Sequence, residues 1–327
     1  MKDCNILLVA VGGIGFRHFQ ALLNCQSGFA LYVVDVNREA LERARVYADQ
    51  QVHNKTVYYL TSVAEIEQNT AFKVAIIATS SLPRKEVFLS VIDHHSVETV
   101  IFEKVLFPRL NDYAEVAELL QSHHINAYVN CIRRTAELYE LLREQLRNSD
   151  CITASARGSN WGLACNSVHM LDLFDFLAST DAKNIICSGA KLEDVLFQSK
   201  RNGYVEFFGA LTGTIGDRVS FSIECDQGDR PLQIQLDTDT QQYKIDEGCG
   251  NVTVLSADGF AQSYHLEDGA LLVSQTTTKI VDRILRGESA GLTTFEDSCR
   301  LHLPILKEFI KKQNQILGKD EDLCPIT

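Results

Sequence analysis

Three glycines lie between an apolar run and an amphipathic segment near the start of the chain, in the order Ile-Leu-Leu-Val-Ala-Val-Gly-Gly-Ile-Gly-Phe-Arg-His over residues 6–18. Residues 6–11 predict a buried parallel strand, and residues 16–23 predict a helix. At such a joint, glycine lets the backbone approach a pyrophosphate and lets the helix pack closely on the strand, while the phosphates bind at the helix N-terminus. The chemistry indicated is the binding of a dinucleotide.

Ala10, Gly12 and Gly15 fill the three places of the G-x-G-x-x-G fingerprint, with alanine in the first. Strand–turn–helix joints also recruit glycine for purely structural reasons, and that alternative stays open for this stretch alone. The candidate cofactor-binding residues of the turn are Gly12, Gly13, Ile14 and Gly15.

An acidic residue follows the second apolar segment, residues 29–34, which ends on Asp35. A carboxylate about 20 residues past the glycines accepts hydrogen bonds from the ribose hydroxyls and repels a 2′-phosphate. Asp35 therefore favours NAD, whereas Arg38 in the same loop would compensate the repulsion and admit NADP. We expect NAD, with NADP as the alternative.

Hydroxyl side chains follow another apolar strand, residues 74–78, in the run Thr79-Ser80-Ser81. In a parallel sheet they would lie at the carboxyl edge, where a cofactor crosses the switch point. A hydroxyl cluster in this place also serves simply as a helix cap. Thr79 and Ser80 are candidate cofactor-binding residues.

Strands and helices alternate through the first part of the chain, and the fifth strand ends on Glu103-Lys104. This alternation predicts an α/β Rossmann domain with a parallel, doubly wound sheet. Further strands are expected at residues 56–60, 97–102 and 126–130, and helices at 39–49, 62–68 (a capping box with Ser62 and Glu65), 83–92 and 110–121.

The glycine turn, the Thr-led turn after the fourth strand and Glu103-Lys104 together resemble the glucose–fructose oxidoreductase / inositol dehydrogenase (Gfo/Idh/MocA) family. That family carries Glu-Lys-Pro at the last position, and the resemblance implies that Lys104 lies between nicotinamide and substrate, with Glu103 beside the cofactor. Val105 replaces the proline. The family's proline follows a cis peptide bond, which valine copies only at a cost.

The resemblance extends into the second half of the chain. Arg133-Arg134 and a helix over residues 136–147 are similar to the family's crossing into its second domain. The family then has Asp-x-x-x-His-x-x-Asp, of which His169 and Asp172 match the later two positions. Cys165 stands at the first position, so a carboxylate is missing there.

The segment from residue 205 to residue 266 contains six strand-like stretches, several with alternating apolar and polar residues, followed by helices over 276–286 and 294–312. This pattern predicts an α+β C-terminal domain with a large open, mainly antiparallel sheet. We place the dinucleotide-binding domain at residues 1–127 and the substrate-binding and oligomerisation domain at residues 128–327. The second face of the sheet, expected to be partly apolar, would pair two copies into a homodimer or homotetramer, and the tail after residue 317 is expected to be loose.

Composition excludes several other classes. The chain has 327 residues, of which 45% are hydrophobic, enough for two cores, and a formal net charge of −12, which disfavours a nucleic-acid partner. No stretch reaches the roughly 20 apolar residues that span a bilayer, and the first apolar run is too short for a signal peptide. Ten cysteines without C-x-x-C spacing indicate free thiols and no metal site. We expect a cytoplasmic protein without a membrane or nucleic-acid partner.

Two functions remain open at this stage. The first is an NAD(P)-dependent oxidoreductase acting on a secondary hydroxyl or carbonyl of a sugar, polyol or nucleotide-activated sugar. In it Lys104 and His169 are catalytic, and Trp161, Asn166 and Asp172 bind the substrate. The second is a catalytically silent dinucleotide- or sugar-sensing protein of the same fold, because fold does not fix function.

Overall fold

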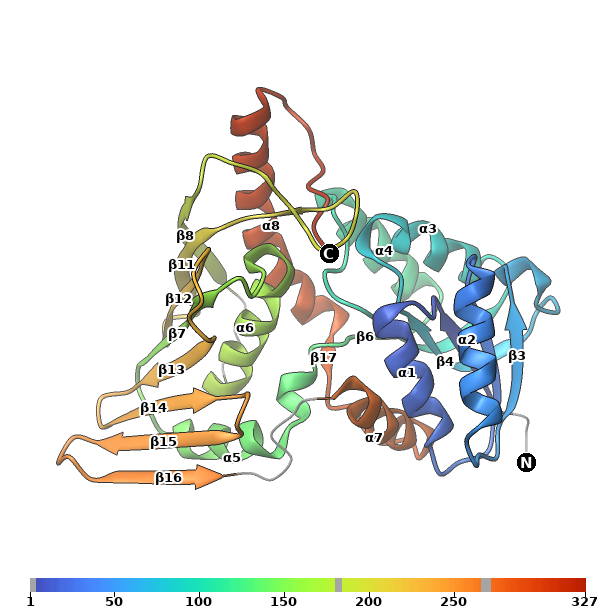
Figure 1. Ribbon diagram of the computed structural model, residues 1–327, viewed down its shortest axis with the longest axis horizontal. Coiled ribbons are helices and arrows are strands. Elements are labelled where there is room, and N and C mark those ends of the chain that lie inside the picture. The colour runs from blue at the N-terminus through green and yellow to red at the C-terminus, as the bar shows by residue number, and fades with distance from the viewer. Residues whose placement is uncertain (1–3, 180–183, 266–271) are drawn as a thin grey trace. The chain divides into compact units, whose positions relative to one another are not determined.

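The computed structural model describes residues 4–179, 184–265 and 272–327, which divide into two compact units (Figure 1). Unit 1 consists of Met1–Phe107, Asn111–Ile132 and Leu272–Phe295, and unit 2 of Pro108–Leu110, Arg133–Leu271 and Glu296–Thr327. The boundary expected between residues 127 and 128 falls within a strand of unit 1. The segment Leu272–Phe295, expected in the C-terminal domain, groups with unit 1.

Unit 1 is built on a seven-stranded sheet in the order β17-β6-β5-β4-β1-β2-β3. Every pairing is parallel except that of β17 with β6. The order of β1 to β6 is that of a Rossmann fold, whose direction reverses between β1 and β4, and it confirms the expected doubly wound sheet. The strands are β1 (Asn5–Val9), β2 (Ala30–Val34), β3 (Thr56–Leu60), β4 (Ala71–Ile77), β5 (Ser96–Phe102), β6 (Asn126–Val129) and β17 (Thr293–Thr294).

The helix α7 (Val273–Leu285) packs on α1 (Gly13–Leu23) although more than 200 residues separate them. Ile280 and Ile284 of α7 belong to the apolar core of the unit, and the Thr278 hydroxyl donates a hydrogen bond to the Ala21 carbonyl at 2.8 Å. The core of unit 1 is therefore completed by a late segment of the chain. The other helices are α2 (Arg38–Asp49), α3 (Ser81–Ile92) and α4 (Leu110–Ser122).

The capped helix expected over residues 62–68 is wrong, because only the short 3₁₀ helix η1 (Val63–Glu65) forms. The Ser62 side chain does accept a hydrogen bond from the Ala64 amide. Glu65, however, accepts from the Thr61 amide and hydroxyl instead of closing a capping box. Ile66 is buried and has an extended backbone conformation. The helix therefore ends after one turn, because the extended backbone at Ile66 is what places its side chain in the core.

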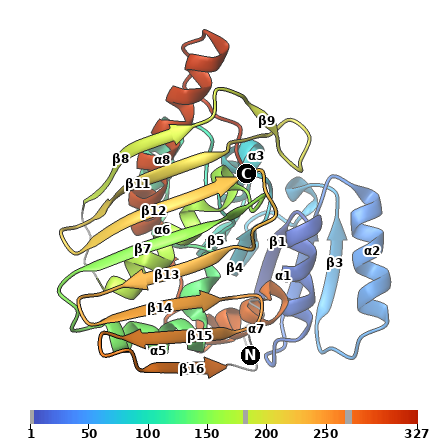
Figure 2. The ribbon, with the colours of Figure 1, turned by 60° about the vertical axis from the view of Figure 1, so that its left-hand side comes forward.

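Unit 2 contains an eight-stranded sheet in the order β16-β15-β14-β13-β7-β12-β11-β8. It is antiparallel except where β7 and β12 run parallel, which confirms the expected mainly antiparallel sheet. Figure 2 shows this sheet face-on with α6 and α8 behind it. The strands are β7 (Ile152–Ser159), β8 (Ile185–Leu192), β11 (Gly209–Ile215), β12 (Val219–Asp226), β13 (Gln233–Asp237), β14 (Gln241–Asp246), β15 (Asn251–Ser256) and β16 (Ala261–His265).

The remaining elements of unit 2 are mostly helices. The helix α6 is buried on nearly all sides and begins at residue 163, earlier than its apolar spacing predicts. Residue 266, the expected end of the last strand, lies outside the described residues. The elements are η2 (Ile132–Thr135), which begins in unit 1, α5 (Glu137–Leu146), α6 (Leu163–Ala178), α8 (Phe295–Leu317) and a two-stranded sheet of β9 (Phe197–Gln198) and β10 (Val205–Glu206).

The second face of the large sheet is polar along β7 and β12, where a partly apolar face was expected, whereas β8 exposes Ile186. Alternation along β7 and β12 buries their apolar side chains on one face and leaves serine and threonine on the other. A shallow hollow on this second face is lined by Thr153, Ser155, Arg157, Ser220, Phe221, Ser222, Gln233, Gln235 and Asp237.

The tail after residue 317 is packed, contrary to the expectation that it is loose. Cys324 and Ile326 are buried, and the Cys324 amide donates to the Pro108 carbonyl at 3.0 Å. The Val205 amide donates to the Pro325 carbonyl at 2.8 Å. Apolar side chains and backbone pairing therefore hold a segment whose composition indicates a loop.

We predict that Ala10→Gly stabilises unit 1. Ala10 has a φ of +71°, a left-handed conformation that costs an L-residue roughly 1–2 kcal/mol and glycine almost nothing. Glycine also gives the unfolded chain more conformational freedom, which lowers stability by about 0.4–1 kcal/mol. The free energy of unfolding in urea should therefore rise by a net amount of about 0.5–1 kcal/mol. A loss of stability in Ala10→Gly would contradict the left-handed turn.

Candidate functional site

The glycine turn joins β1 to α1 with very little room. A Cβ atom on Gly15 would lie 1.9 Å from the Ala10 carbonyl oxygen, so only glycine fits there. This is the close helix–strand packing that the third glycine of the fingerprint provides.

The open side of the same turn suits an anion. A Cβ atom on Gly12 or Gly13 would meet no heavy atom within 4 Å, and the first turn of α1 contains no acidic residue. The first amides of a helix are unsatisfied within it and attract negative charge. Arg43 of α2 adds positive charge, because its guanidinium donates to the Val11 carbonyl at 2.9 Å and to the Gly12 carbonyl at 3.3 Å.

Asp35 lies directly after β2 and faces this turn. Its Oδ2 accepts a hydrogen bond from the Val11 amide at 2.7 Å, and its Oδ1 accepts one from the Asn37 amide at 2.8 Å. Each carboxylate oxygen has capacity for a further donor, such as a ribose hydroxyl. Arg38 is exposed at the start of α2.

Thr79 and Ser80 follow β4 at the carboxyl edge, beside the end of β1. The Thr79 hydroxyl is buried and has no hydrogen-bond partner within the described part of the chain. Ser80 is the N-cap residue of α3, but its side chain makes no capping hydrogen bond. Together with the open turn and Asp35, these hydroxyls at the switch point fit a bound dinucleotide.

Glu103 is buried in a polar cluster at the end of β5. Its Oε1 accepts hydrogen bonds from His18 Nε2 at 2.9 Å and from the Asn130 amide at 2.6 Å, and His18 Nδ1 lies 2.9 Å from the Thr277 hydroxyl. Burial alone would raise the pKa of Glu103, but these hydrogen bonds and the charge of Lys104 hold it below its usual value. The carboxylate, expected beside the cofactor, is enclosed by protein groups.

The Lys104 segment is also held from its other side. The buried Arg84 guanidinium of α3 donates to the carbonyls of Val105, Leu106 and Thr79. The Lys104–Val105 peptide bond is cis, and the Lys104 side chain is half-buried. One arginine therefore ties the segment after β5 to the segment after β4.

In unit 2, His169 and Asp172 lie on α6, as the sequence predicts. His169 is half-buried, whereas Asp172 is completely buried and forms a two-pronged ion pair with Arg134, at 2.9 Å from Nε and 2.7 Å from Nη2. The Arg134 guanidinium also packs over the Phe176 ring. Asp172 thus anchors the helix that carries His169.

Trp161 and Asn166 lie side by side where α6 begins, and both are half-buried. The indole N–H donates to the Glu224 carbonyl at 2.9 Å, and the Asn166 amide donates to the Trp161 carbonyl at 2.6 Å. These bonds fix the turn that precedes α6.

Sequence reasoning missed two residues of these surroundings, Arg84 and Glu206. Glu206 accepts hydrogen bonds from the backbone amides of Ala164 and Cys165 at the start of α6. No local pattern could have found it, because about 40 residues separate it from that helix. Arg84 looks like an ordinary helix-surface residue in the sequence, and only the approach of the loop after β5 explains it.

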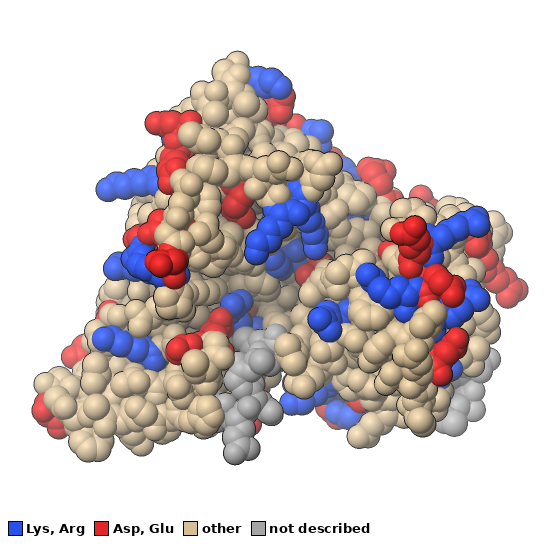
Figure 3. Space-filling model, viewed as in Figure 1, with Lys and Arg blue, Asp and Glu red and all other residues tan. Residues whose placement is uncertain are grey.

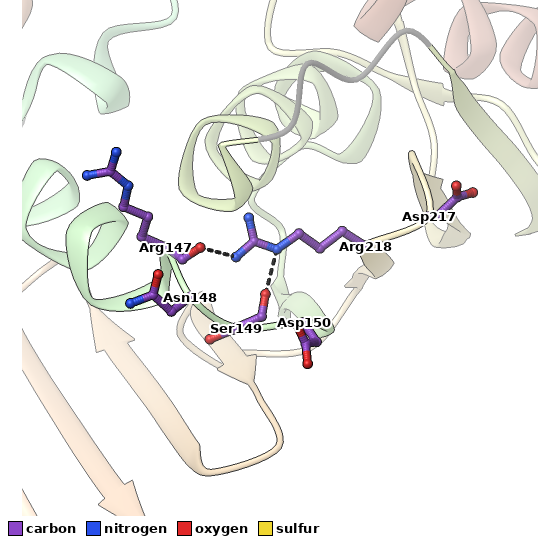
Figure 4. A pocket seen from close by; sticks show the side chains of 6 residues that line it. All are labelled: Arg147, Asn148, Ser149, Asp150, Asp217 and Arg218. Atoms are coloured by element: carbon purple, nitrogen blue, oxygen red, sulfur yellow. Dashed lines mark hydrogen bonds between the residues drawn. The ribbon is translucent and has the colours of Figure 1, made fainter.

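A separate hollow of unit 2 is lined by Arg147, Asn148, Ser149, Asp150, Asp217 and Arg218 (Figure 4). Arg218 donates to the carbonyls of Leu146, Arg147, Ser149 and Ala178. The guanidinium therefore caps the C-terminal ends of α5 and α6, which is a structural role.

Other site classes find no support in the described residues. They contain no group of three His, Cys, Asp or Glu side chains arranged to hold a metal ion. None of their helices combines the length and the apolar character that crossing a membrane requires. Figure 3 shows acidic and basic side chains intermingled over α2 rather than a uniformly basic face there.

Comparison with known proteins shows the fold. No family model matches the sequence, and no curated protein matches it. Among solved structures, a dehydrogenase (MviM) from Clostridium difficile is 14% identical with a TM-score of 0.68, covering 95% of this chain and 99% of that one. GenD2 from gentamicin A biosynthesis, in complex with NAD, is 15% identical with a TM-score of 0.69, and the match covers 94% of this chain and 93% of GenD2. A super-repressor mutant of Gal80p from Saccharomyces cerevisiae is 14% identical with a TM-score of 0.70 and covers 97% of both chains.

The chain has the fold of these proteins. This similarity confirms the fold that the sequence resemblance predicts. The proteins that share the fold include both dehydrogenases and Gal80p. At this level of identity the chemistry has to be argued from the residues.

We predict that Gly12→Ala weakens dinucleotide binding whereas Gly13→Ala does not. Both added methyl groups enter open space, but residue 12 occupies the second fingerprint place, where a Cβ atom separates the backbone from a pyrophosphate. We expect at least about a tenfold loss of NADH affinity for Gly12→Ala, equivalent to about 1.4 kcal/mol, in calorimetric titration. Thermal melting of both variants is the control, and equal NADH affinities would contradict the assignment of the turn.

Proposed function

We propose that this protein is an NAD-dependent oxidoreductase that transfers hydride between nicotinamide and a secondary hydroxyl or carbonyl of a sugar, polyol or nucleotide-activated sugar. The observation that carries the proposal is the Rossmann switch point, where the open glycine turn, Asp35 and the buried Thr79 hydroxyl suit a dinucleotide. The NAD complex of GenD2 and an NAD+ complex of an Agrobacterium radiobacter oxidoreductase, both of this fold, support the cofactor.

The dinucleotide, when bound, accepts or supplies the hydride. The amides of the glycine turn hold its pyrophosphate, Asp35 accepts from its ribose, and Thr79 and Ser80 offer hydroxyls at the edge of the sheet. Arg38 is exposed near Asp35 and sets how well a 2′-phosphate is tolerated.

The chain itself supplies proton transfer and positioning. In our proposal His169 acts as a general base toward the substrate hydroxyl. Lys104 donates a hydrogen bond to a substrate oxygen that gains negative charge. Glu103 and Arg84 fix the Lys104 segment, and the Arg134–Asp172 ion pair fixes the His169 helix. Asn166 forms hydrogen bonds with substrate hydroxyls, and Trp161 packs against the face of a sugar ring.

A catalytically silent sensor is the second candidate. The likeness to Gal80p, named a transcriptional regulator in its Kluyveromyces lactis form, favours it, as does Cys165 where the resembled family has a carboxylate. Lys104 and His169 favour the oxidoreductase instead, because each is half-buried on a segment that buried hydrogen bonds and ion pairs hold in place.

We expect NADH to bind more tightly than NADPH. Asp35 already accepts two backbone amides, so its carboxylate is fixed in place and repels an added phosphate. Asp35→Ala should narrow or reverse the preference, and Arg38→Ala should widen it, in calorimetric titration with both dinucleotides. Tighter binding of NADPH by the wild type would show that Arg38 governs this loop.

We expect His169→Ala and Lys104→Met to lower kcat far more than they weaken NADH binding. A general base contributes roughly 10²–10⁴-fold, so the loss at His169 should exceed ordinary packing effects. Cys165→Ser is the matched control on the same helix and should keep nearly full activity. The mechanism is refuted by His169→Ala retaining full turnover while Cys165→Ser loses it, because proton transfer would then pass through the thiol.

A further inference from the structure

Glu206, at the end of β10, binds the start of α6 with both carboxylate oxygens. Oε1 accepts hydrogen bonds from the amides of Ala164 at 2.5 Å and Phe207 at 2.9 Å, and Oε2 accepts one from the Cys165 amide at 3.4 Å. Ala164 and Cys165 belong to the first turn of α6, whose amides find no acceptor within the helix. A residue about 40 positions away in the chain therefore performs the work of an N-cap.

The helix has no cap of its own. Its N-cap position is Gly162, with a φ of +83° and no side chain, and its first turn contains no acidic residue. A Cβ atom on Gly162 would lie 3.1 Å from Glu206 Oε2. Glycine at this position leaves room for the carboxylate, and any other residue would press against it.

The carboxylate is also fixed from its own side. Val205 pairs with Gln198 of β9, and its amide donates to the Pro325 carbonyl at 2.8 Å. The next side chain, Phe207, is completely buried and stacks on Phe309 at 4.9 Å between ring centroids. Backbone pairing at Val205 and the buried ring of Phe207 therefore fix the position of Glu206 from both sides.

We infer that Glu206 is a positioning residue for His169, and that it provides from β10 the negative charge which the α6 sequence lacks at Cys165. His169 lies six residues beyond Leu163, about 9 Å along the helix at 1.5 Å per residue. A carboxylate bound at the start of the helix attracts the imidazolium that forms when His169 takes a proton, because opposite charges at this range are only partly screened in a half-buried site. The catalytic half of this inference rests on the proposed function.

Charge relocation tests the inference. Glu206→Gln keeps an acceptor for the Ala164 amide but removes the charge, and we expect kcat to fall about tenfold with KM and NADH affinity little changed. Cys165→Asp alone places a second carboxylate beside Glu206 and should also lower kcat, whereas in the Glu206→Gln background it should restore kcat to within about threefold of wild type. If Cys165→Asp has the same effect in both backgrounds, the inference is wrong.

A second measurement does not depend on turnover. Replacing the carboxylate with a neutral amide weakens the hydrogen bonds that hold the Ala164 and Cys165 amides, so both amides should exchange hydrogen several-fold faster in Glu206→Gln. The Asn166 amide, which donates to the Gly162 carbonyl at 2.9 Å, is the internal control in nuclear magnetic resonance. An unchanged exchange rate at both amides overturns the inference even in an active enzyme. Faster exchange in a protein that turns over no substrate supports the contact and refutes the proposed function instead.

Should Glu206→Gln not fold, the pair Cys165→Asp and Cys165→Asn gives the answer in the wild-type background. The two side chains have nearly the same shape and differ in charge. Thermal melting should show the aspartate variant less stable than the asparagine variant, because only the former faces Glu206 with a like charge. Equal melting temperatures would contradict the inference.

Discussion

The hydrogen bond from His18 to Glu103 joins the two parts of unit 1 on which the proposed chemistry depends, the helix that follows the glycine turn and the strand end that carries Lys104. A buried carboxylate costs several kcal/mol unless hydrogen bonds satisfy it. Because a carboxylate only accepts, His18 Nε2 must carry a proton, and Asn130 supplies the second donor. Thr277 meets the other ring nitrogen, so the late segment that contains α7 is required for the cluster. The pKa of Glu103 is lowered, so the stability that this cluster contributes is present at neutral pH and is lost only as the pH falls through that lowered value.

In unit 2, two contacts between residues far apart in the sequence hold α6 in place in a similar way. Glu206 satisfies the amides at its start, and Arg134 pairs with the fully buried Asp172 one turn beyond His169. Removing Arg134 would leave the buried charge of Asp172 uncompensated, and removing Glu206 would leave amides at the start of the helix without an acceptor, so both contacts are costly to change. In each unit, then, a candidate catalytic side chain is half-buried on a segment that charged side chains from elsewhere in the unit hold in place.

The sequence predicted the features that depend on local pattern. Apolar runs and glycine spacing located β1 and α1, and period-two alternation located most of the large sheet, because side-chain direction follows from the backbone repeat. Prediction failed where distant segments decide the outcome. Residues 62–68 form a single 3₁₀ turn because Ile66 is buried, the tail is ordered because Cys324 and Ile326 reach a core, and Glu206 meets α6 only through the fold. The polar face along β12 could be read from the sequence, since Ser220 and Ser222 alternate with the apolar residues of that strand.

The fold is shared by dehydrogenases and by Gal80p, so it leaves the choice between catalysis and sensing to the residues. The central claim is that Lys104 and His169 perform hydride-transfer chemistry and do not merely survive in a binding protein. The most direct measurement is nicotinamide absorbance when the purified protein is incubated with NAD or NADH and a panel of sugars, polyols and nucleotide-activated sugars or their keto forms. We predict that at least one compound is oxidised or reduced, with a rate that His169→Ala abolishes. Binding of NAD and of a sugar without turnover of any compound in either direction would contradict the claim and identify the protein as a sensor.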